Sequence, residues 1–483
     1  MIHRLQGSRW GEQLAVSVLW LGDGDRLRGA IVPDPAVDRD PEEGRHPPLV
    51  VAALEAAQGY DKTPGAIPSN ERHRPDFGVR CPSDRRLPVL GTASVIAEIN
   101  TVDAITQTAA PNDAGTNRPP NPPFIRSGHL TVPGFSDHRI YWEEYGTITG
   151  EPVMVMHGGP GAGSHSSATR FFDLQRYRVI LFDQRGCGKS SPSASEDDAT
   201  AALTDNTTRH LIDDVSALRH ELNIDGKMHV FGGSWGSTLA LAYAIAHPAT
   251  VQTLILRGVF LCRRADVDYF FQGNAAEFAP DPLAMPVPGT YLDFPTAWRH
   301  FVDAIPPKDR GDIVMGLAKI FAVPPRTEAE RGRLVKAASA CVAWEGNASR
   351  LNHDENSHGQ PNEKYALTVA RIMVHYMING GFLDAKGEAS RDNNYILDNV
   401  ALLRDIPVNV VHGRYDRVCH LYQAEALVRA LRSAGNNAVN YFITTAGHSS
   451  FEPETDTKLR TIMNELPPMT PPETVSQRHL PCG

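Results

Sequence analysis

A serine flanked by glycines is the residue most clearly placed for nucleophilic chemistry. The sequence Gly-Gly-Ser-Trp-Gly spans residues 232–236, between an apolar run at 228–231 that predicts a strand and a small-residue run at 237–246 that predicts a helix. A serine on such a sharp turn is held at the carboxyl end of the strand, beside the amide groups that open the helix. We therefore predict that Ser234 is a nucleophile.

A serine nucleophile needs a base and an orienting acid, and both residue types follow it in the order Ser, Asp, His. Asp416 comes shortly after the apolar run 408–411, and His448 comes after the apolar run 439–443. Loops at the carboxyl ends of strands are where α/β sheets build their sites. The order and the placement favour a catalytic triad of Ser234, Asp416 and His448.

A glycine-rich turn is the candidate for stabilising negative charge during the reaction. His-Gly-Gly-Pro-Gly spans residues 157–161 and follows the predicted strand at 152–156. Such a loop donates one backbone N–H to an oxyanion, and the residue after the nucleophile donates another. We assign Gly159 and Trp235 to this oxyanion hole.

The elements that must position these residues alternate between strand and helix. Period-2 and short apolar runs predict strands, the first two antiparallel, at 130–132, 138–142, 152–156, 179–182, 228–231, 251–256, 408–411 and 439–443. Helical periodicity predicts helices at 207–222, 237–246 and 424–431. The fold class predicted is α/β, with a mostly parallel central sheet flanked by helices.

Changes in composition and periodicity along the chain also predict domain boundaries. Residues 1–125 lack sustained periodicity and end in a proline-rich stretch, so we expect a poorly ordered N-terminal extension. Residues 264–400 are aromatic-rich and mainly helical in pattern, which indicates a helical cap inserted into the sheet domain. The core is then expected at 126–263 and 401–465, with a C-terminal tail at 466–483.

Composition excludes several classes of protein. The chain has 483 residues, of which 41% are hydrophobic and 21% charged, as is usual for soluble globular proteins. Its 47 basic and 56 acidic residues give a net charge of -9, and no basic run is interleaved with aromatics, which argues against nucleic acid as a partner. The sequence contains no uninterrupted run of about 18 to 20 apolar residues, so it predicts no membrane-spanning helix.

The cysteines and the first residues bear on compartment and cofactors. The six cysteines are scattered without paired short spacings, which argues against a zinc site or a disulfide framework. The apolar run 14–21 is short, and no small-residue cleavage site follows it, so we reject a secretory signal. We expect a cytoplasmic protein with neither metal nor organic cofactor; the sequence does not define its oligomeric state.

Five segments together resemble the proline iminopeptidase (prolyl aminopeptidase) family of the α/β-hydrolase superfamily. They lie at 157–161, 183–188 (Asp-Gln-Arg-Gly-Cys-Gly), 232–236, 256–260 and 413–416. The resemblance extends over about residues 126–465. It implies the α/β-hydrolase fold and a serine hydrolase that releases N-terminal proline from small peptides through an acyl-enzyme.

The resemblance also implies residues that bind the substrate. The family recognises a charged secondary amine, for which a carboxylate is the natural partner, and Glu345 matches its first such glutamate. Arg257 matches a family residue near the active site. Similar enzymes carry a second glutamate where this chain has Met373.

Two alternatives to a prolyl aminopeptidase stay open. Met373 makes the pocket more apolar, which could suit an esterase, amidase or thioesterase-like hydrolase acting on a small metabolite. A non-catalytic binding protein is motivated only by the unusual N-terminal segment, and it conflicts with a complete triad.

Overall fold

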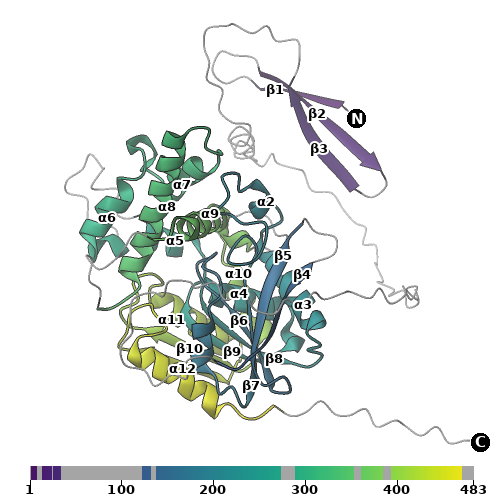
Figure 1. Cartoon of the computed structure of the whole chain (residues 1–483), viewed down its shortest axis with the longest axis vertical. Helices are drawn as coiled ribbons and strands as arrows, with labels where there is room; N and C mark the ends of the chain where they lie inside the picture. Colours follow the sequence, from purple (N-terminus) through teal and green to yellow (C-terminus); the bar gives the residue numbers. More distant parts are fainter. Residues whose placement is uncertain are drawn as a thin grey trace, which may run out of the picture. The chain divides into compact units, whose positions relative to one another are not determined.

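Figure 1 shows the computed structural model, which separates into two units, Met1–Gln107 and Thr108–Gly483. It describes residues 2–7, 14–23, 26–33, 122–131, 137–272, 289–352, 361–383 and 393–469, and the first three ranges are described only as strands. The predicted tail at 466–483 falls mostly outside these residues.

The first unit contains three strands that the sequence analysis did not foresee. β1 (Ile2–Gly7), β2 (Leu14–Asp23) and β3 (Arg26–Pro33) form an antiparallel sheet in the order β1-β2-β3. The apolar run that we weighed as a secretory signal lies within β2. Its β-branched and aromatic residues Val16, Val18 and Trp20, two positions apart, are typical of a strand. The rest of the expected extension, 34–121, lies outside the described residues.

The second unit is built on an eight-stranded sheet. Its strands are β4 (Phe124–Thr131), β5 (Arg139–Gly146), β6 (Glu151–Met156), β7 (Tyr177–Phe182), β8 (Met228–Ser234), β9 (Val251–Val259), β10 (Val408–Gly413) and β11 (Val439–Thr444). They lie in the order β11-β10-β9-β8-β6-β7-β5-β4. Only the β4–β5 and β5–β7 pairs are antiparallel, which confirms the predicted, mostly parallel sheet. β4 begins at Phe124, two residues before the predicted start of the core.

Alternate residues of the strands pack on opposite faces of this sheet. In β6, Val153 and Val155 belong to one buried cluster, and Met154 and Met156 belong to the other. The first cluster includes side chains of the 3₁₀ helix η1 (Ser166–Phe171) and of α12 (Pro453–Glu465). The larger cluster includes side chains from α3 (Thr208–Glu221), α4 (Trp235–Ala246) and α11 (Tyr422–Ser433). The sheet is therefore covered on both faces, as parallel sheets require.

The described residues between β9 and β10 include five helices of the predicted cap. They are α5 (Arg264–Phe271), α6 (Pro295–Val302), α7 (Ile313–Phe321), α8 (Glu328–Ala348) and α9 (Glu363–Ile378), and α8 packs on α6, α7 and α9. α8 starts with a capping box in which Thr327 and Glu330 satisfy each other's backbone N–H groups. Trp344 of α8 lies at the centre of the cap core, with its ring stacked on Phe301 at 5.8 Å.

The end of the predicted cap belongs to the core. α10 (Tyr395–Asp398) packs against α4 and α11, so this helix is not part of the cap, which was predicted to run to residue 400. The remaining short elements are α2 (Thr200–Leu203) and the 3₁₀ helices η2 (Pro248–Thr250), η4 (Thr290–Leu292), η5 (Pro307–Asp309), η6 (Gly380–Phe382) and η7 (Val400–Leu403). Among the described residues, no helix combines the length and apolarity needed to span a membrane.

Candidate active site

Ser234 stands on a strained turn between β8 and α4. Its φ of 57° and ψ of -130° lie outside the regions that a side chain normally allows. The neighbouring glycines make the turn possible: a Cβ on Gly232 would lie 2.2 Å from Gly236 O, and one on Gly236 would lie 2.0 Å from Met156 O. The structure therefore places Ser234 where the sequence predicted a nucleophile elbow.

Asp416 and His448 come together from loops that are 32 residues apart in the chain. His448 Nδ1 and Asp416 Oδ2 are separated by 2.8 Å, and Asp416 Oδ1 accepts hydrogen bonds from Val418 N at 3.0 Å and Cys419 N at 2.8 Å. Burial alone would raise the pKa of Asp416, but attraction to His448, together with these donors, lowers it below its usual value. Asp416 is therefore an anion aimed at His448.

His412 is a site residue that the sequence analysis missed. Its Nδ1 accepts from Val259 N at 3.1 Å, so the ring proton is on Nε2, which donates to Cys419 O at 2.7 Å. Burial lowers the pKa of His412, which keeps the ring neutral even though Nε2 lies 3.5 Å from Asp416 Oδ2. A histidine within the buried apolar run of β10 was the available signal. It fixes the loop that carries Asp416 against β9.

Arg257 determines which nitrogen of His448 carries the proton. Its Nη1 lies 3.2 Å from His448 Nε2 and donates to His448 O at 2.8 Å. A guanidinium only donates, so Nε2 accepts and Nδ1 carries the proton that bonds to Asp416. This is the tautomer in which a histidine base works. Within the described residues, Nε2 bonds to Arg257 and not to Ser234 Oγ; such bonds often form only when the substrate is bound.

The predicted oxyanion loop passes directly over Ser234. A Cβ on Gly158 would lie 3.1 Å from Ser234 Cβ, and Gly159 lines the same cavity as Ser234. Trp235 is the first residue of α4, where backbone N–H groups have no acceptor within the helix. Both predicted donors therefore lie next to Ser234.

One cavity joins the predicted nucleophile to the cap. Its lining is mostly apolar and comprises Gly159, Ser234, Phe260, Asp266, Val267, Phe270, Phe271, Glu345, Met373, Met377, Val418 and Cys419. Glu345 comes from α8, whereas Met373 and Met377 stand one turn apart on α9. The structure thus brings Ser234 into the same cavity as Glu345 and Met373, two of the three predicted substrate-binding residues.

The two carboxylates that line this cavity differ in their partners. Asp266 accepts hydrogen bonds from the Arg263 side chain at 2.9 Å and from Tyr422 Oη at 2.5 Å, so its charge is already compensated. Among the described residues, nothing donates a hydrogen bond to the Glu345 carboxylate. Burial raises the pKa of Glu345 to about 7, although the positive charge of Arg257 opposes the shift. Glu345 is therefore the carboxylate available to a cationic ligand.

Glu452 links the cap to the loop that carries His448, a contact that the sequence did not reveal. Its carboxylate accepts from Leu351 N at 2.6 Å, just beyond α8, and from Gly447 N at 2.5 Å. A second bond joins Ser449 N to Ser349 O at 2.8 Å. The end of the helix that carries Glu345 is thus fixed relative to His448.

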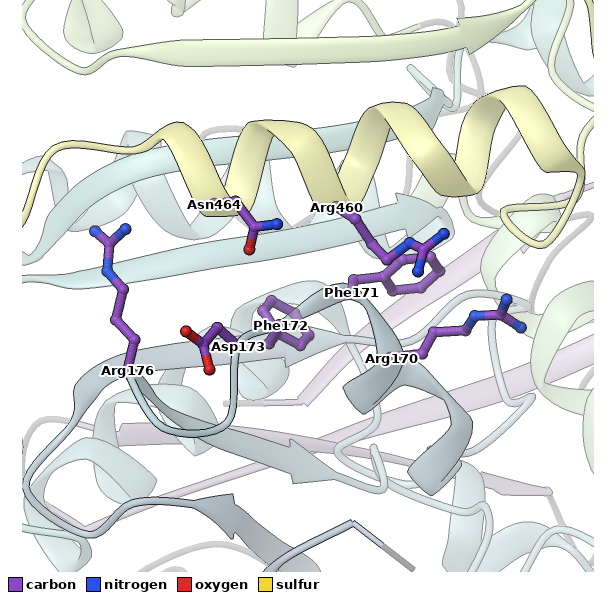
Figure 2. Close-up of a pocket in the computed structure, with 7 residues that line it drawn as sticks. All are labelled: Arg170, Phe171, Phe172, Asp173, Arg176, Arg460 and Asn464. Carbon is purple, nitrogen blue, oxygen red and sulfur yellow. The ribbon is translucent and has the colours of Figure 1, made fainter. Parts of the chain in front are cut away.

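A second pocket lies between η1 and α12, the two elements whose side chains pack in the smaller buried cluster. Figure 2 shows its lining residues: Arg170, Phe171, Phe172, Asp173, Arg176, Arg460 and Asn464. Arg170 and Arg460 both pair with Asp456, and Arg176 pairs with Glu151. Its cations are already compensated, and it contains none of the predicted site residues.

Metal ligands do not gather in the described part of the chain. No group of three or more His, Cys, Asp or Glu side chains there could hold a metal ion. Cys187, Cys262, Cys341 and Cys419 are buried free thiols. Burial raises the pKa of each thiol, so they are poor nucleophiles at neutral pH.

Comparison with known families agrees with this architecture. Residues 151–455 match the family model described as the alpha/beta hydrolase fold. This segment contains Ser234, Asp416 and His448, together with the whole cap. The protein is an α/β hydrolase.

Sequence similarity to individual proteins identifies the family within this class. The proline iminopeptidase of Xanthomonas citri is 40% identical over 318 residues, which cover 66% of this chain and 89% of that one. The proline iminopeptidase of Arabidopsis thaliana is 39% identical over 330 residues, covering 68% and 76%. That of Neisseria gonorrhoeae is 35% identical over 332 residues, covering 68% and 92%. The chain belongs to the proline iminopeptidase family.

Proposed function

We propose that this hydrolase removes N-terminal proline from small peptides by acyl transfer through Ser234. The observation that carries the proposal is the cavity that Ser234 shares with Glu345. A strained serine, supported by a bonded Asp–His pair, supplies the hydrolytic chemistry. A carboxylate without a hydrogen-bond donor in the same cavity supplies an anchor for a cationic amine.

The reaction follows from the positions of these groups. Ser234 Oγ attacks the carbonyl carbon of the N-terminal residue while His448 Nε2 accepts the hydroxyl proton. The carbonyl oxygen becomes an oxyanion, and the N–H groups of Gly159 and Trp235 stabilise it. The C–N bond then breaks as His448 returns the proton to the leaving amine. Water, deprotonated by His448, hydrolyses the acyl-enzyme ester.

Asp416 and Arg257 prepare His448 for this role. Asp416 holds the proton on Nδ1 and stabilises the imidazolium that forms in each step. Arg257 keeps Nε2 free of a proton before attack, because its guanidinium can only donate to that nitrogen. Arg257 Nη1 must release Nε2 when the Ser234 hydroxyl begins to donate its proton.

The amine anchor explains why the enzyme would act at the N-terminus. A protonated N-terminal amine next to Glu345 lowers the pKa of that carboxyl again and keeps it ionised. A proline further along the chain has an amide nitrogen, which carries no charge for Glu345 to bind. The apolar side chains around Glu345, such as Phe270 and Phe271, suit the carbon atoms of a proline ring.

Met373 favours one alternative, a hydrolase for small esters or amides without a free amine. Met373 and Met377 give the cavity flexible apolar walls, and Glu345 is its single uncompensated carboxylate among the described residues. A neutral apolar acyl group would fit this lining without any need for Glu345.

Three substrates separate the two candidates: a proline arylamide, its N-acetylated counterpart and a simple aryl ester. Steady-state rates are measured for the wild type and for Ser234→Ala. Turnover confined to the free-amine arylamide, and lost in Ser234→Ala, supports the aminopeptidase. Preference for the ester or the blocked substrate supports the alternative, and turnover that survives in Ser234→Ala contradicts both.

We also propose that the protein works in the cytoplasm. The described cysteines are free and buried, which fits a reducing compartment. Localisation of the tagged full-length chain would test this.

A further inference from the structure

Gln184 takes no part in the proposed reaction steps, yet both polar atoms of its side chain form hydrogen bonds next to the site. It lies just after β7 and is 3% exposed. Its Nε2 donates to His157 O at 2.9 Å, and its Oε1 accepts from Trp235 Nε1 at 3.0 Å. Its backbone N–H also donates to His157 Nε2 at 3.0 Å.

These partners belong to the two segments that supply the oxyanion hole. His157 opens the loop that carries Gly159, and Trp235 follows Ser234. The two segments come from different strands, β6 and β8, and Gln184 comes from a third, β7. One amide side chain thus bridges both segments.

The loop that carries Gln184 is itself held on both sides. Asp183 Oδ1 accepts from Ser164 N at 2.6 Å, and its Oδ2 accepts from Lys189 N at 2.8 Å. Arg185 forms a buried two-point ion pair with Asp214, with N–O distances of 2.8 and 2.7 Å. The backbone of Gln184 is therefore a fixed reference point for the bridge.

His157 is fixed in one state by the same contacts. Because the Gln184 N–H donates to Nε2, the ring proton is on Nδ1, which donates to Gly158 O at 2.9 Å. Burial lowers the pKa of His157, so the ring stays neutral. The oxyanion loop therefore has defined bonds to Gln184 at both the ring and the backbone of its first residue.

We propose that Gln184 is a positioning residue that holds the Gly159 and Trp235 N–H groups at the spacing an oxyanion requires. The proposal rests on the acyl-transfer function proposed above. An oxyanion hole works only when both donors lie about 2.7–3.1 Å from a single point, and a misplacement of about 1 Å can reduce a rate about 100-fold. Gln184 neither touches the reacting atoms nor lines the cavity with the substrate-binding residues.

Gln184→Met tests this role because methionine keeps the approximate shape and removes both side-chain bonds. With the proline arylamide we expect kcat to fall about 10- to 100-fold while KM stays within about twofold. A proline boronic acid, which forms a tetrahedral adduct with the serine, should lose affinity by the same factor. The affinity of free proline, which forms no oxyanion, should be unchanged.

Trp235→Phe removes one of the two bridging bonds and keeps the main chain. It should cause a smaller loss in kcat, and the double variant should be less impaired than the product of the two single effects, because both remove the same bond. If Gln184→Met fails to fold, Trp235→Phe measured with the boronic acid and with proline still decides the proposal.

Gln423→Met is the matched control. Gln423 is also buried and accepts from Leu261 N at 2.9 Å, but among the described residues its side chain makes no hydrogen bond to either oxyanion segment. It should lower the melting temperature while kcat stays within about twofold. Equal kcat losses in Gln184→Met and Gln423→Met, or a change in KM alone, would overturn the positioning role. Failure of the wild type to turn over any of the three substrates, with no fluorophosphonate labelling of Ser234, would instead contradict the proposed function.

Discussion

The sheet side and the cap side of the cavity are built in opposite ways. On the sheet side, Asp416 accepts three hydrogen bonds and His448 has a partner at each ring nitrogen. On the cap side, the Glu345 carboxylate has no donor within the described residues and stands among aromatic rings and the two methionines of α9. The groups proposed for catalysis are therefore hydrogen-bonded before a substrate binds, whereas the proposed amine anchor has no hydrogen-bond donor among the described residues.

This difference indicates which substitutions should lower the rate on every substrate and which should lower it only on one class of substrate. Sheet residues act as one bonded unit, so the loss of any member should affect every substrate. Cap residues act separately, so their loss should affect only substrates that carry the matching group. Four predictions test this division.

The largest effect is expected from Asp416→Asn. An amide cannot stabilise the imidazolium and favours the wrong tautomer of His448, so kcat should fall about 10⁴-fold for the arylamide and the ester alike. Steady-state rates on both substrates measure this. The control is Asp266→Asn, a buried carboxylate that lines the same cavity but is bonded to Arg263 and Tyr422. Similar losses in the two variants would remove the distinction between the sheet and cap sides.

Glu345→Gln should have the next largest effect, and only on free-amine substrates. Leaving a bound ammonium without its partner costs about 2 kcal/mol or more, so kcat/KM for the proline arylamide should fall about 30-fold or more. The rate on the N-acetylated substrate should not fall. Glu363→Gln, which removes an ion pair between α9 and Arg331 at the surface, serves as the control. An equal loss on both substrates would show that Glu345 supports the fold or the chemistry and not the amine.

Met373→Glu should sharpen specificity by about tenfold, measured as the ratio of kcat/KM for the free-amine and N-acetylated arylamides. A second carboxylate in the cavity adds one charge-assisted hydrogen bond to the amine, worth about 1.5 kcal/mol. Met377→Glu places the same charge one turn further along α9, in the same cavity. If both variants gain equally, added charge alone explains the effect and position 373 has no special role.

The smallest effect expected is a few-fold fall in kcat/KM across about one pH unit centred on the pKa of Glu345. Glu345 has a pKa of about 7, so it is neutral below that pH and ionised above it. Below pH 7 the anchor is lost, and kcat/KM for the free-amine substrate should decline with a component near 7. The N-acetylated substrate and Glu345→Gln should both lack this component, which comparison of the four pH profiles would reveal.

The same ionisation should affect stability with a defined sign. The folded-state pKa of Glu345 lies above the value of about 4.3 expected for an unfolded chain, so the folded state binds more protons between these values. The glutamate therefore destabilises the fold progressively as pH rises from about 4 to 7. Denaturant unfolding of wild type and Glu345→Gln should diverge over this range; parallel curves would contradict the shift.

Much of the fold could be predicted from local pattern. Strands such as β6 and β7 are buried on both faces and read as continuous apolar runs, and the elbow at Ser234 lies between a strand and a helix that periodicity predicts. The three N-terminal strands were missed because the alternation within each run is short and incomplete. The cap was predicted to extend too far because α10 has a helical pattern but packs against core helices.

The sequence by itself determined the types and the order of the residues proposed for chemistry: Ser234 on a glycine turn, then Asp416 and His448 after later strands. The order of residues and the ends of predicted strands are local properties, so they can be predicted from the sequence alone. Only the tertiary structure decided which polar groups meet: His412 with Val259 N and Cys419 O, Arg257 with His448, and Gln184 with the two oxyanion segments. These contacts join residues from 7 to 191 positions apart in the chain. Most of them depend on the order of the strands in the sheet, which no local pattern encodes.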